Sequence, residues 1–100
     1  MNRDEIRSLS HALFGNADRL TAAAAIGRLA GKPISAMAVA EESGLGYNRA
    51  QEQVTHFKRA NLLIPDADSR LRRKDYRTVE LSYWNSAVRL LDELISLDDL

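Results

Sequence analysis

The side chains with the clearest potential for recognition chemistry lie in residues 47–61. Asn48, Arg49 and Gln51 stand close together there and carry amide or guanidinium groups. These groups suit the edges of DNA bases in the major groove, where arginine pairs with guanine and asparagine or glutamine with adenine. The segment therefore predicts a helix that reads bases. The residues that we expect it to place on DNA are Tyr47, Asn48, Arg49, Gln51, Glu52 and Thr55.

The apolar residues of this segment predict which way the helix faces. At about 100° per residue, Ala50, Val54 and Phe57 share one side and would point inward. The residues on the opposite side, with those that flank them, are Asn48, Glu52, Thr55 and Arg59, then Arg49, Gln51 and His56. The alternative is an ordinary solvated helix face, to which any one of these residues could belong.

Glu52 is the exception on the outward side, because its carboxylate would repel DNA phosphate. It could accept a hydrogen bond from cytosine N4. It could instead pair with a neighbouring basic side chain, either Arg49 or His56. The sequence does not decide between these two roles.

A second group of basic residues follows in the polar stretch after Pro65. We expect this stretch to form the tip of a hairpin, because residues 62–64 and 76–82 have the apolar content of short strands. The basic side chains at this tip are Arg70, Arg72, Arg73 and Lys74. Side chains at a loop tip can reach phosphate or a narrow minor groove. The alternative is a hairpin whose charges only aid solubility.

The formal charges of the chain cancel, but they are unevenly distributed. Residues 1–46 hold five basic and five acidic side chains, residues 47–78 hold eight and four, and residues 79–100 hold one and five. The middle of the chain therefore has an excess of four positive charges. Attraction to phosphate depends on such a local face rather than on the sum over the molecule.

Hydrophobic periodicity and cap residues predict the elements that must position these groups. The chain is predicted to be mainly α with a small β-hairpin, in the order helix, helix, strand, helix, helix, strand, strand, helix. The expected helices span residues 3–13, 17–30 after a cap at Asn16, 36–43 after a cap at Ser35, 47–61 and 83–97, and the expected strands 32–34, 62–64 and 76–82. Residues 1–100 would form one domain, with a helix-turn-helix at 35–61 and a hairpin, or wing, at 62–82.

Cap and turn residues support these boundaries. Ser35 can cap the third helix, and Gly44 can end it in a left-handed conformation. Leu45 would be the one apolar residue buried in the following turn. Asn61 suits a left-handed position after the fourth helix, and Ser82 suits the cap of the last helix.

The apolar residues also predict the core. The residues expected inside from the third helix and the return strand are Met37, Val39, Ala40, Val79 and Leu81. The second helix carries alanines and Gly27 along one side, so another helix could approach it closely.

Three stretches of the chain resemble winged-helix bacterial repressors of the ArsR and MarR type. Residues 38–45, AVAEESGL, resemble the first helix and turn of their helix-turn-helix. Residues 53–63, QVTHFKRANLL, resemble the end of their recognition helix, and residues 13–20, LFGNADRL, resemble the start of the ArsR second helix. The resemblance implies a winged helix-turn-helix fold and a transcriptional regulator, typically a repressor, that binds a palindromic site as a homodimer.

The chain departs from the family pattern at three places. Ala17 replaces the usual proline, and Asn61 replaces the usual glycine. Residues 46–49, GYNR, replace the usual start of the recognition helix, so the DNA sequence that is read would differ.

The last helix suggests a partner copy independently of the resemblance. Tyr83, Leu90 and Leu97 recur at seven-residue spacing beside a second apolar stripe, which is more apolar surface than one core-facing helix needs. The expected dimer interface comprises Ile6, Leu9, Leu13, Tyr83, Leu90, Leu94 and Leu97. The alternative is a last helix that its own domain covers entirely.

Other classes of function lack the residues that they need. The chain has no cysteine and only two histidines, His11 and His56, which disfavours a transition-metal site. It has no glycine-rich phosphate loop and no nucleophile paired with a base, so we expect neither a cofactor nor an enzyme. An apolar pocket near Phe14 and Trp84 could hold a small-molecule effector, although core packing is the commoner role of such residues.

The expected partner is double-stranded DNA, without a membrane. No stretch has the ~18 apolar residues of a membrane helix, and residues 1–10 carry charges in place of a signal-peptide core, so we expect a cytoplasmic protein. The rival interpretation is a winged-helix protein-interaction module without direct DNA binding. Salt-dependent binding to duplex DNA distinguishes the two.

Overall fold

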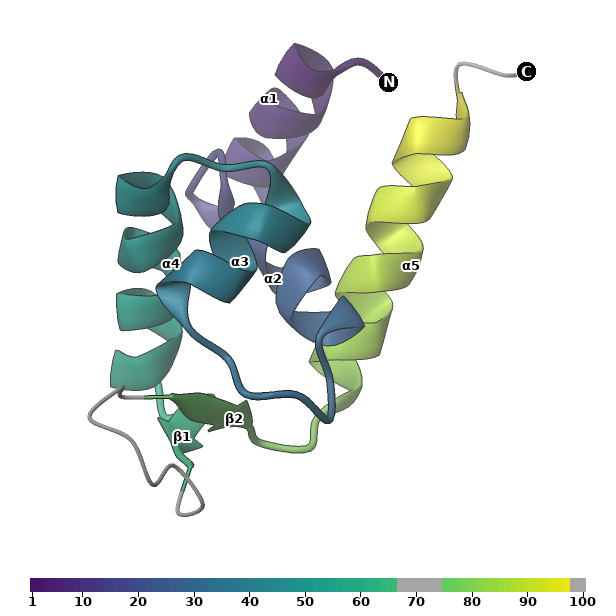
Figure 1. The fold of residues 1–100 in the computed structure, drawn as a ribbon. Helices are drawn as coiled ribbons and strands as arrows, with labels where there is room; N and C mark the ends of the chain where they lie inside the picture. The colour runs from purple at the N-terminus through teal and green to yellow at the C-terminus, as the bar shows by residue number, and fades with distance from the viewer. Residues whose placement is uncertain (67–74, 98–100) are drawn as a thin grey trace.

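Helix α2 (Arg19–Arg28) lies at the centre of the molecule (Figure 1). The computed structural model describes residues 1–66 and 75–97. Within these ranges α2 contacts four helices, α1 (Arg3–Phe14), α3 (Ala36–Ser43), α4 (Tyr47–Arg59) and α5 (Ser82–Ser96). The alanines at 22–25 are fully buried, because side chains this small let helices pack against several sides of α2.

A close helix contact joins α2 to α5. A Cβ atom on Gly27 would lie 2.7 Å from the carbonyl oxygen of Trp84 and 2.8 Å from Cγ2 of Val88. The absence of a side chain at Gly27 is therefore what permits this approach, as the small residues of this helix predicted. Trp84 is buried and meets Phe57 of α4 edge to face, with 5.1 Å between ring centroids.

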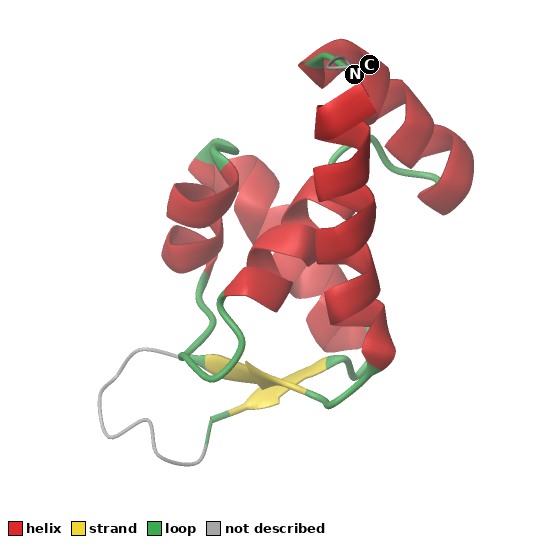
Figure 2. Ribbon diagram, turned by 90° about the vertical axis from the view of Figure 1, so that its right-hand side faces the viewer, coloured by secondary structure: helices red, strands yellow, loops and turns green. Residues whose placement is uncertain are grey.

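A two-stranded antiparallel hairpin covers one end of the helical body (Figure 2). Strand β1 (Leu63–Pro65) pairs with β2 (Tyr76–Thr78), and Ile64 faces Arg77 in the register. Ile34 adds an isolated bridge to Tyr76, with backbone hydrogen bonds of 2.7 and 2.8 Å. The predicted tip residues Arg70, Arg72, Arg73 and Lys74 lie outside the described residues.

The described residues confirm the class that the sequence predicts, mainly helical with a small hairpin. They form five helices and one two-stranded sheet, and the strand predicted at 32–34 is reduced to an isolated bridge at Ile34. The cap residues expected at both ends of α3 and after α4 are present as well. Ser35 Oγ accepts a hydrogen bond from the Ala38 N–H at 3.1 Å, and Gly44 and Asn61 adopt left-handed φ values of 76° and 61°.

Helix boundaries differ from the prediction where local hydrogen bonds compete with the helix. Helix α2 begins at Arg19, and Asn16 does not cap it, because the Asn16 side chain accepts the Asp18 N–H at 2.9 Å in a turn before the helix. Ser82 is the first residue of α5 and does not cap it; Leu81 occupies the cap position and makes no side-chain hydrogen bond there.

The prediction of which residues of the return strand are buried was wrong, and so was the prediction that Met37 is buried. Strand β2 ends at Thr78, and its buried residue is Tyr76, which the bridge to Ile34 holds inside. Leu81 follows the strand and is exposed instead of buried. Met37 lies in the first turn of α3 on the side away from the core, where over half of it is exposed.

None of the helices in the described ranges combines the length and the apolar character that crossing a bilayer requires.

Candidate nucleic-acid interface

Helices α3 and α4 pack against each other and are joined by a turn at Gly44–Gly46. Leu45 in this turn is half-buried, and its N–H donates to Ser43 Oγ at 3.1 Å. Helix α4 buries Ala50, Val54 and Phe57, as predicted. These contacts fix the rotation of α4 about its own axis, and they determine which of its side chains reach solvent.

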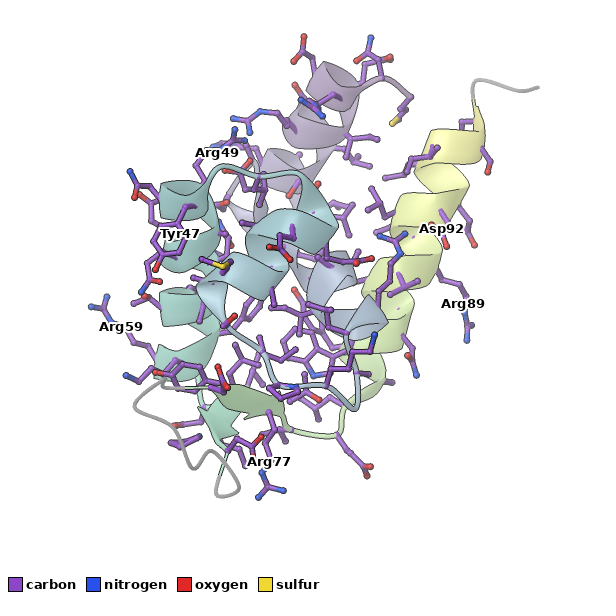
Figure 3. The ribbon with its side chains drawn as sticks, viewed as in Figure 1. Tyr47, Arg49, Arg59, Arg77, Arg89 and Asp92 are labelled. Atoms are coloured by element: carbon purple, nitrogen blue, oxygen red, sulfur yellow. The ribbon has the colours of Figure 1, made fainter. Side chains whose placement is uncertain are left out.

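The solvent-facing side of α4 carries the amide and basic side chains that the sequence singled out. Its exposed residues are Tyr47, Asn48, Arg49, Gln51, Glu52, His56, Lys58 and Arg59, and Thr55 is half-buried. Tyr47 and Arg59 project from α4 on the side away from α5 (Figure 3). Six of the seven residues predicted outward from helical periodicity are exposed, and Thr55 is the exception.

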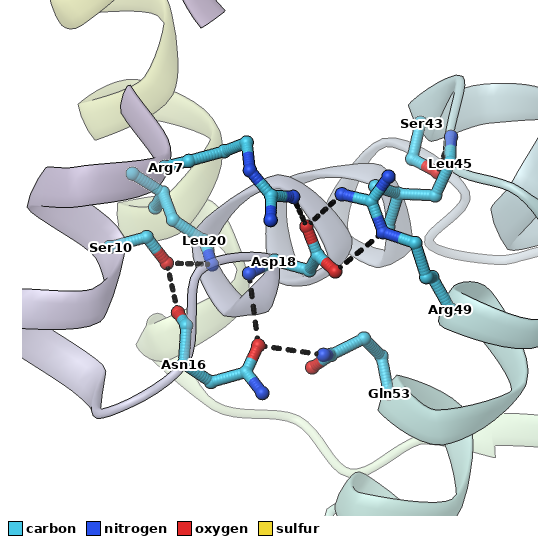
Figure 4. Close-up of polar contacts among 9 residues, drawn as sticks. All are labelled: Arg7, Ser10, Asn16, Asp18, Leu20, Ser43, Leu45, Arg49 and Gln53. Carbon is cyan, nitrogen blue, oxygen red and sulfur yellow. Dashed lines mark hydrogen bonds and ion pairs between the residues drawn. The ribbon is translucent and has the colours of Figure 1, made fainter. Parts of the chain in front are cut away.

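Arg49 differs from the other members of this set because an acidic residue holds it. Its Nε donates to Oδ2 of Asp18 at 2.8 Å, and its Nη2 contacts Oδ1 of the same carboxylate. Arg7 of α1 contacts Oδ1 from the opposite side (Figure 4). The Arg49 guanidinium is therefore directed toward the turn between α1 and α2, although nearly half of the side chain stays exposed.

A buried polar network continues along the same side of α4. Gln53 is only 1% exposed, and its Nε2 donates to Oδ1 of Asn16 at 2.9 Å. Arg19 Nε donates to Oε1 of Gln53 at 2.7 Å, and its guanidinium lies 5.7 Å from the centroid of the Phe57 ring. The sequence analysis missed Gln53, although its position three residues after Ala50 and four before Phe57 indicates the buried face.

His56 completes this network. Its Nε2 lies 2.7 Å from Nη1 of Arg19, and because a guanidinium can only donate, this nitrogen must be unprotonated. Burial, and secondarily the charge of Arg19, lowers the pKa of His56 below 6.5. His56 is therefore held neutral as part of the contact between α2 and α4. Burial also raises the pKa of Tyr83 above its usual 10.0.

Glu52 has no basic partner in the part of the chain that the structure describes. The two candidates proposed from sequence are both engaged elsewhere, Arg49 with Asp18 and His56 with Arg19. The interpretation of Glu52 as an intrahelical ion-pair partner is therefore wrong. Its pairing with cytosine N4 stays a prediction.

The predicted dimer residues fall into three groups by exposure. Ile6 and Leu94 are each 7% exposed and belong to the core of the single chain, so little of either is available to a partner. Leu9, Tyr83 and Leu90 are half-buried. Leu13 and Leu97 are 57% and 45% exposed, and Ile95, which was not among the seven, is 52% exposed.

The structure gives no support to the effector pocket suggested near Phe14 and Trp84. Trp84 belongs to the core, and its Nε1 donates to the Val79 carbonyl at 2.9 Å. A cavity of about 340 Å³ is lined by residues of all five helices, most of them polar or charged, and neither Phe14 nor Trp84 is among them. Within residues 1–66 and 75–97, no group of three or more histidine, cysteine or acidic side chains is placed to bind a metal ion.

Comparison with known proteins gives no match at any level, whether against protein-family models, curated proteins or solved structures.

Proposed function

We propose that the chain is a winged helix-turn-helix protein that binds double-stranded DNA as a transcriptional regulator. In this proposal α4 is the recognition helix in the major groove. The hairpin at residues 62–82 is the wing, which contacts phosphate or the minor groove. The ArsR and MarR resemblance of the sequence agrees with this arrangement and makes a repressor the expected type of regulator.

The observation that carries the proposal is the division of α4 into two faces. One face is fixed by Ala50, Val54 and Phe57 in the core, and the other exposes Asn48 and Gln51 to solvent. Helix α4 has 13 residues, which corresponds to about 20 Å, and a major groove accommodates an α-helix. An exposed helix of this length with base-pairing side chains is suited to reading a few base pairs.

The exposed basic residues support the same orientation of α4 toward DNA. Lys58 and Arg59 are exposed at the end of α4, and Arg77 is exposed on β2 of the hairpin. Arg59 and Arg77 both project into solvent (Figure 3). Phosphate contacts by such side chains set the position of a protein on the duplex, while the amides on α4 would supply sequence preference.

We further propose that two copies bind together. Leu13, Ile95 and Leu97 are large apolar side chains exposed on or next to α1 and α5, and a second copy could cover them. A two-fold dimer would place its recognition helices about one turn of DNA apart, ~34 Å. This dimer predicts a palindromic site.

Selection of duplexes from a random library tests the proposal. We expect enrichment of a defined sequence by the wild type and its loss in Asn48→Ala and Gln51→Ala, because each bidentate contact to a base contributes about 1–3 kcal/mol. Asn85→Ala is the matched control, since Asn85 is exposed on α5. No enriched sequence from folded protein would reject the proposal and favour a protein-interaction module.

A further inference from the structure

Two large apolar side chains remain exposed at the α3–α4 face, where the core does not need them. Met37 is 54% exposed in the first turn of α3, and Tyr47 is 55% exposed at the first position of α4. Both line one cavity of about 470 Å³. Their side chains give this cavity apolar lining that a bound molecule could contact.

The rest of the cavity has the chemistry of a nucleic-acid groove contact. Gln51 and Thr55 follow Tyr47 at successive four-residue intervals, so the three share one stripe of α4. Lys58 and Arg59 also line the cavity, against one acidic residue, Asp75. The cavity therefore combines an apolar end, an amide and a net positive charge.

The position of Lys58 shows where the phosphate side of the cavity lies. Its Nζ lies 5.6 Å from the centroid of the Tyr76 ring, on the hairpin side of α4. Tyr47 begins α4, about three turns before Lys58, and Met37 lines the same cavity from the first turn of α3. A duplex strand along this surface would have its backbone near Lys58 and Arg59 and its base edges near Gln51.

We infer that this cavity reads an A·T base pair, with the thymine methyl group against Met37 and Tyr47 and the adenine edge against Gln51. Thymine is the base that presents a methyl group in the major groove, and apolar side chains are what distinguish it there. Glutamine is suited to adenine N6 and N7. The inference rests on the proposed DNA binding and names Met37 as a specificity residue that lies outside the recognition helix.

Replacing thymine by uracil removes this methyl group and leaves base pairing intact. In the duplex selected by the wild type, uracil is placed at one thymine position at a time and affinity is measured by fluorescence anisotropy. We expect a loss of about fourfold at one position of each half-site, the effect of one buried methyl-sized group. The other thymine positions should tolerate uracil.

Variants assign the effect to the cavity. Met37→Gln keeps the length of an exposed side chain but makes it polar, so the variant should fold and bind with a reduced preference for thymine over uracil, because only the Tyr47 ring still contacts the methyl group. Tyr47→Phe should retain the preference, because the ring remains. Leu81→Gln is the control, since Leu81 is also an exposed apolar residue but does not line the cavity.

The outcomes separate this inference from the proposed function. Tight binding of the selected duplex with no position sensitive to uracil would overturn the inference alone. A full thymine preference in Met37→Gln would overturn it as well. If folded protein selects no duplex, the proposed DNA binding fails first and the inference with it.

Discussion

Asp18 ties the start of the proposed recognition helix to the rest of the molecule. Its carboxylate, only 13% exposed, contacts Arg7 of α1 and Arg49 of α4. Two guanidinium groups on one carboxylate give charge-assisted hydrogen bonds, which are stronger than neutral ones. The orientation of α4 therefore depends on a side chain in the turn before α2.

Replacing Asp18 by asparagine should lower the free energy of unfolding by about 1–2 kcal/mol, because the charge-assisted bonds are lost while both arginines stay partly solvated. Urea denaturation measures the change. Asp92→Asn is the control. Asp92 is 60% exposed and pairs with Arg28 at 2.6 Å, so its loss should cost under about 0.5 kcal/mol. Equal losses in the two variants would contradict this role of Asp18.

His56 should make stability depend on pH. Its pKa in the folded protein lies below 6.5, so the unfolded chain binds the proton more tightly. Stability is therefore complete above about pH 6.5 and decreases as the pH falls from there through the folded pKa. We expect His56→Gln to lose less stability on acidification than the wild type. An NMR titration of the His56 ring with a midpoint at or above 6.5 would contradict the explanation.

Single residues differ in how far the sequence could predict their positions. Helical periodicity was sufficient for the exposed face of α4, because Ala50, Val54 and Phe57 fix its rotation locally. The bond between Asp18 and Arg49 was not predictable, since these residues are 31 positions apart in the chain. Met37 was misplaced because its apolar character alone suggested the core, whereas the packing of α3 turns it outward.

At the scale of elements, the contact between α2 and α5 sets the shape of the helical body. The run of small residues in α2 predicted a close partner helix, and Gly27 against Trp84 is that contact. Strand ends were harder to predict. The return strand stops at Thr78 because its partner β1 has only three residues, and this length depends on pairing rather than on the apolar pattern.

Gly27→Ala should destabilise the protein by about 1–3 kcal/mol, the usual cost of overpacking, even though alanine favours a helix by about 1 kcal/mol. The reason is the 2.7 Å separation between the new Cβ and a backbone oxygen of α5. Gly46→Ala is the control, because no atom lies within 4 Å of a Cβ placed there. Thermal unfolding should show a clearly smaller loss for the control, and a stabilised Gly27→Ala would contradict the close packing.

At the scale of the whole molecule, the exposed apolar residues of α1 and α5 should hold two copies together. Sedimentation equilibrium is expected to give twice the 11.2 kDa mass of the chain. Leu97→Glu should shift the equilibrium toward monomer, because it places a charge in the proposed interface at a position where the leucine is 45% exposed. Leu81→Glu is the control, because Leu81 is equally exposed but lies at the other end of α5. A monomer at all concentrations would reject the dimer.

The uneven distribution of charge along the chain also gives the whole molecule basic and acidic regions. The excess of basic residues lies in residues 47–78 and the excess of acidic residues in 79–100. Exposed Arg59 and Arg89 mark two separate regions of the surface, one on α4 and the other on the far side of α5 (Figure 3). If α4 meets DNA, only the first of these arginines should sense the phosphates.

The salt dependence of duplex binding tests the central claim most directly. The logarithm of the binding constant for the selected duplex should fall linearly with the logarithm of salt concentration, and the slope should become shallower by about one in Arg59→Gln. Arg89→Gln should leave the slope unchanged. Absence of duplex binding at low salt, or an equal change of slope in both variants, would contradict the placement of DNA on α4.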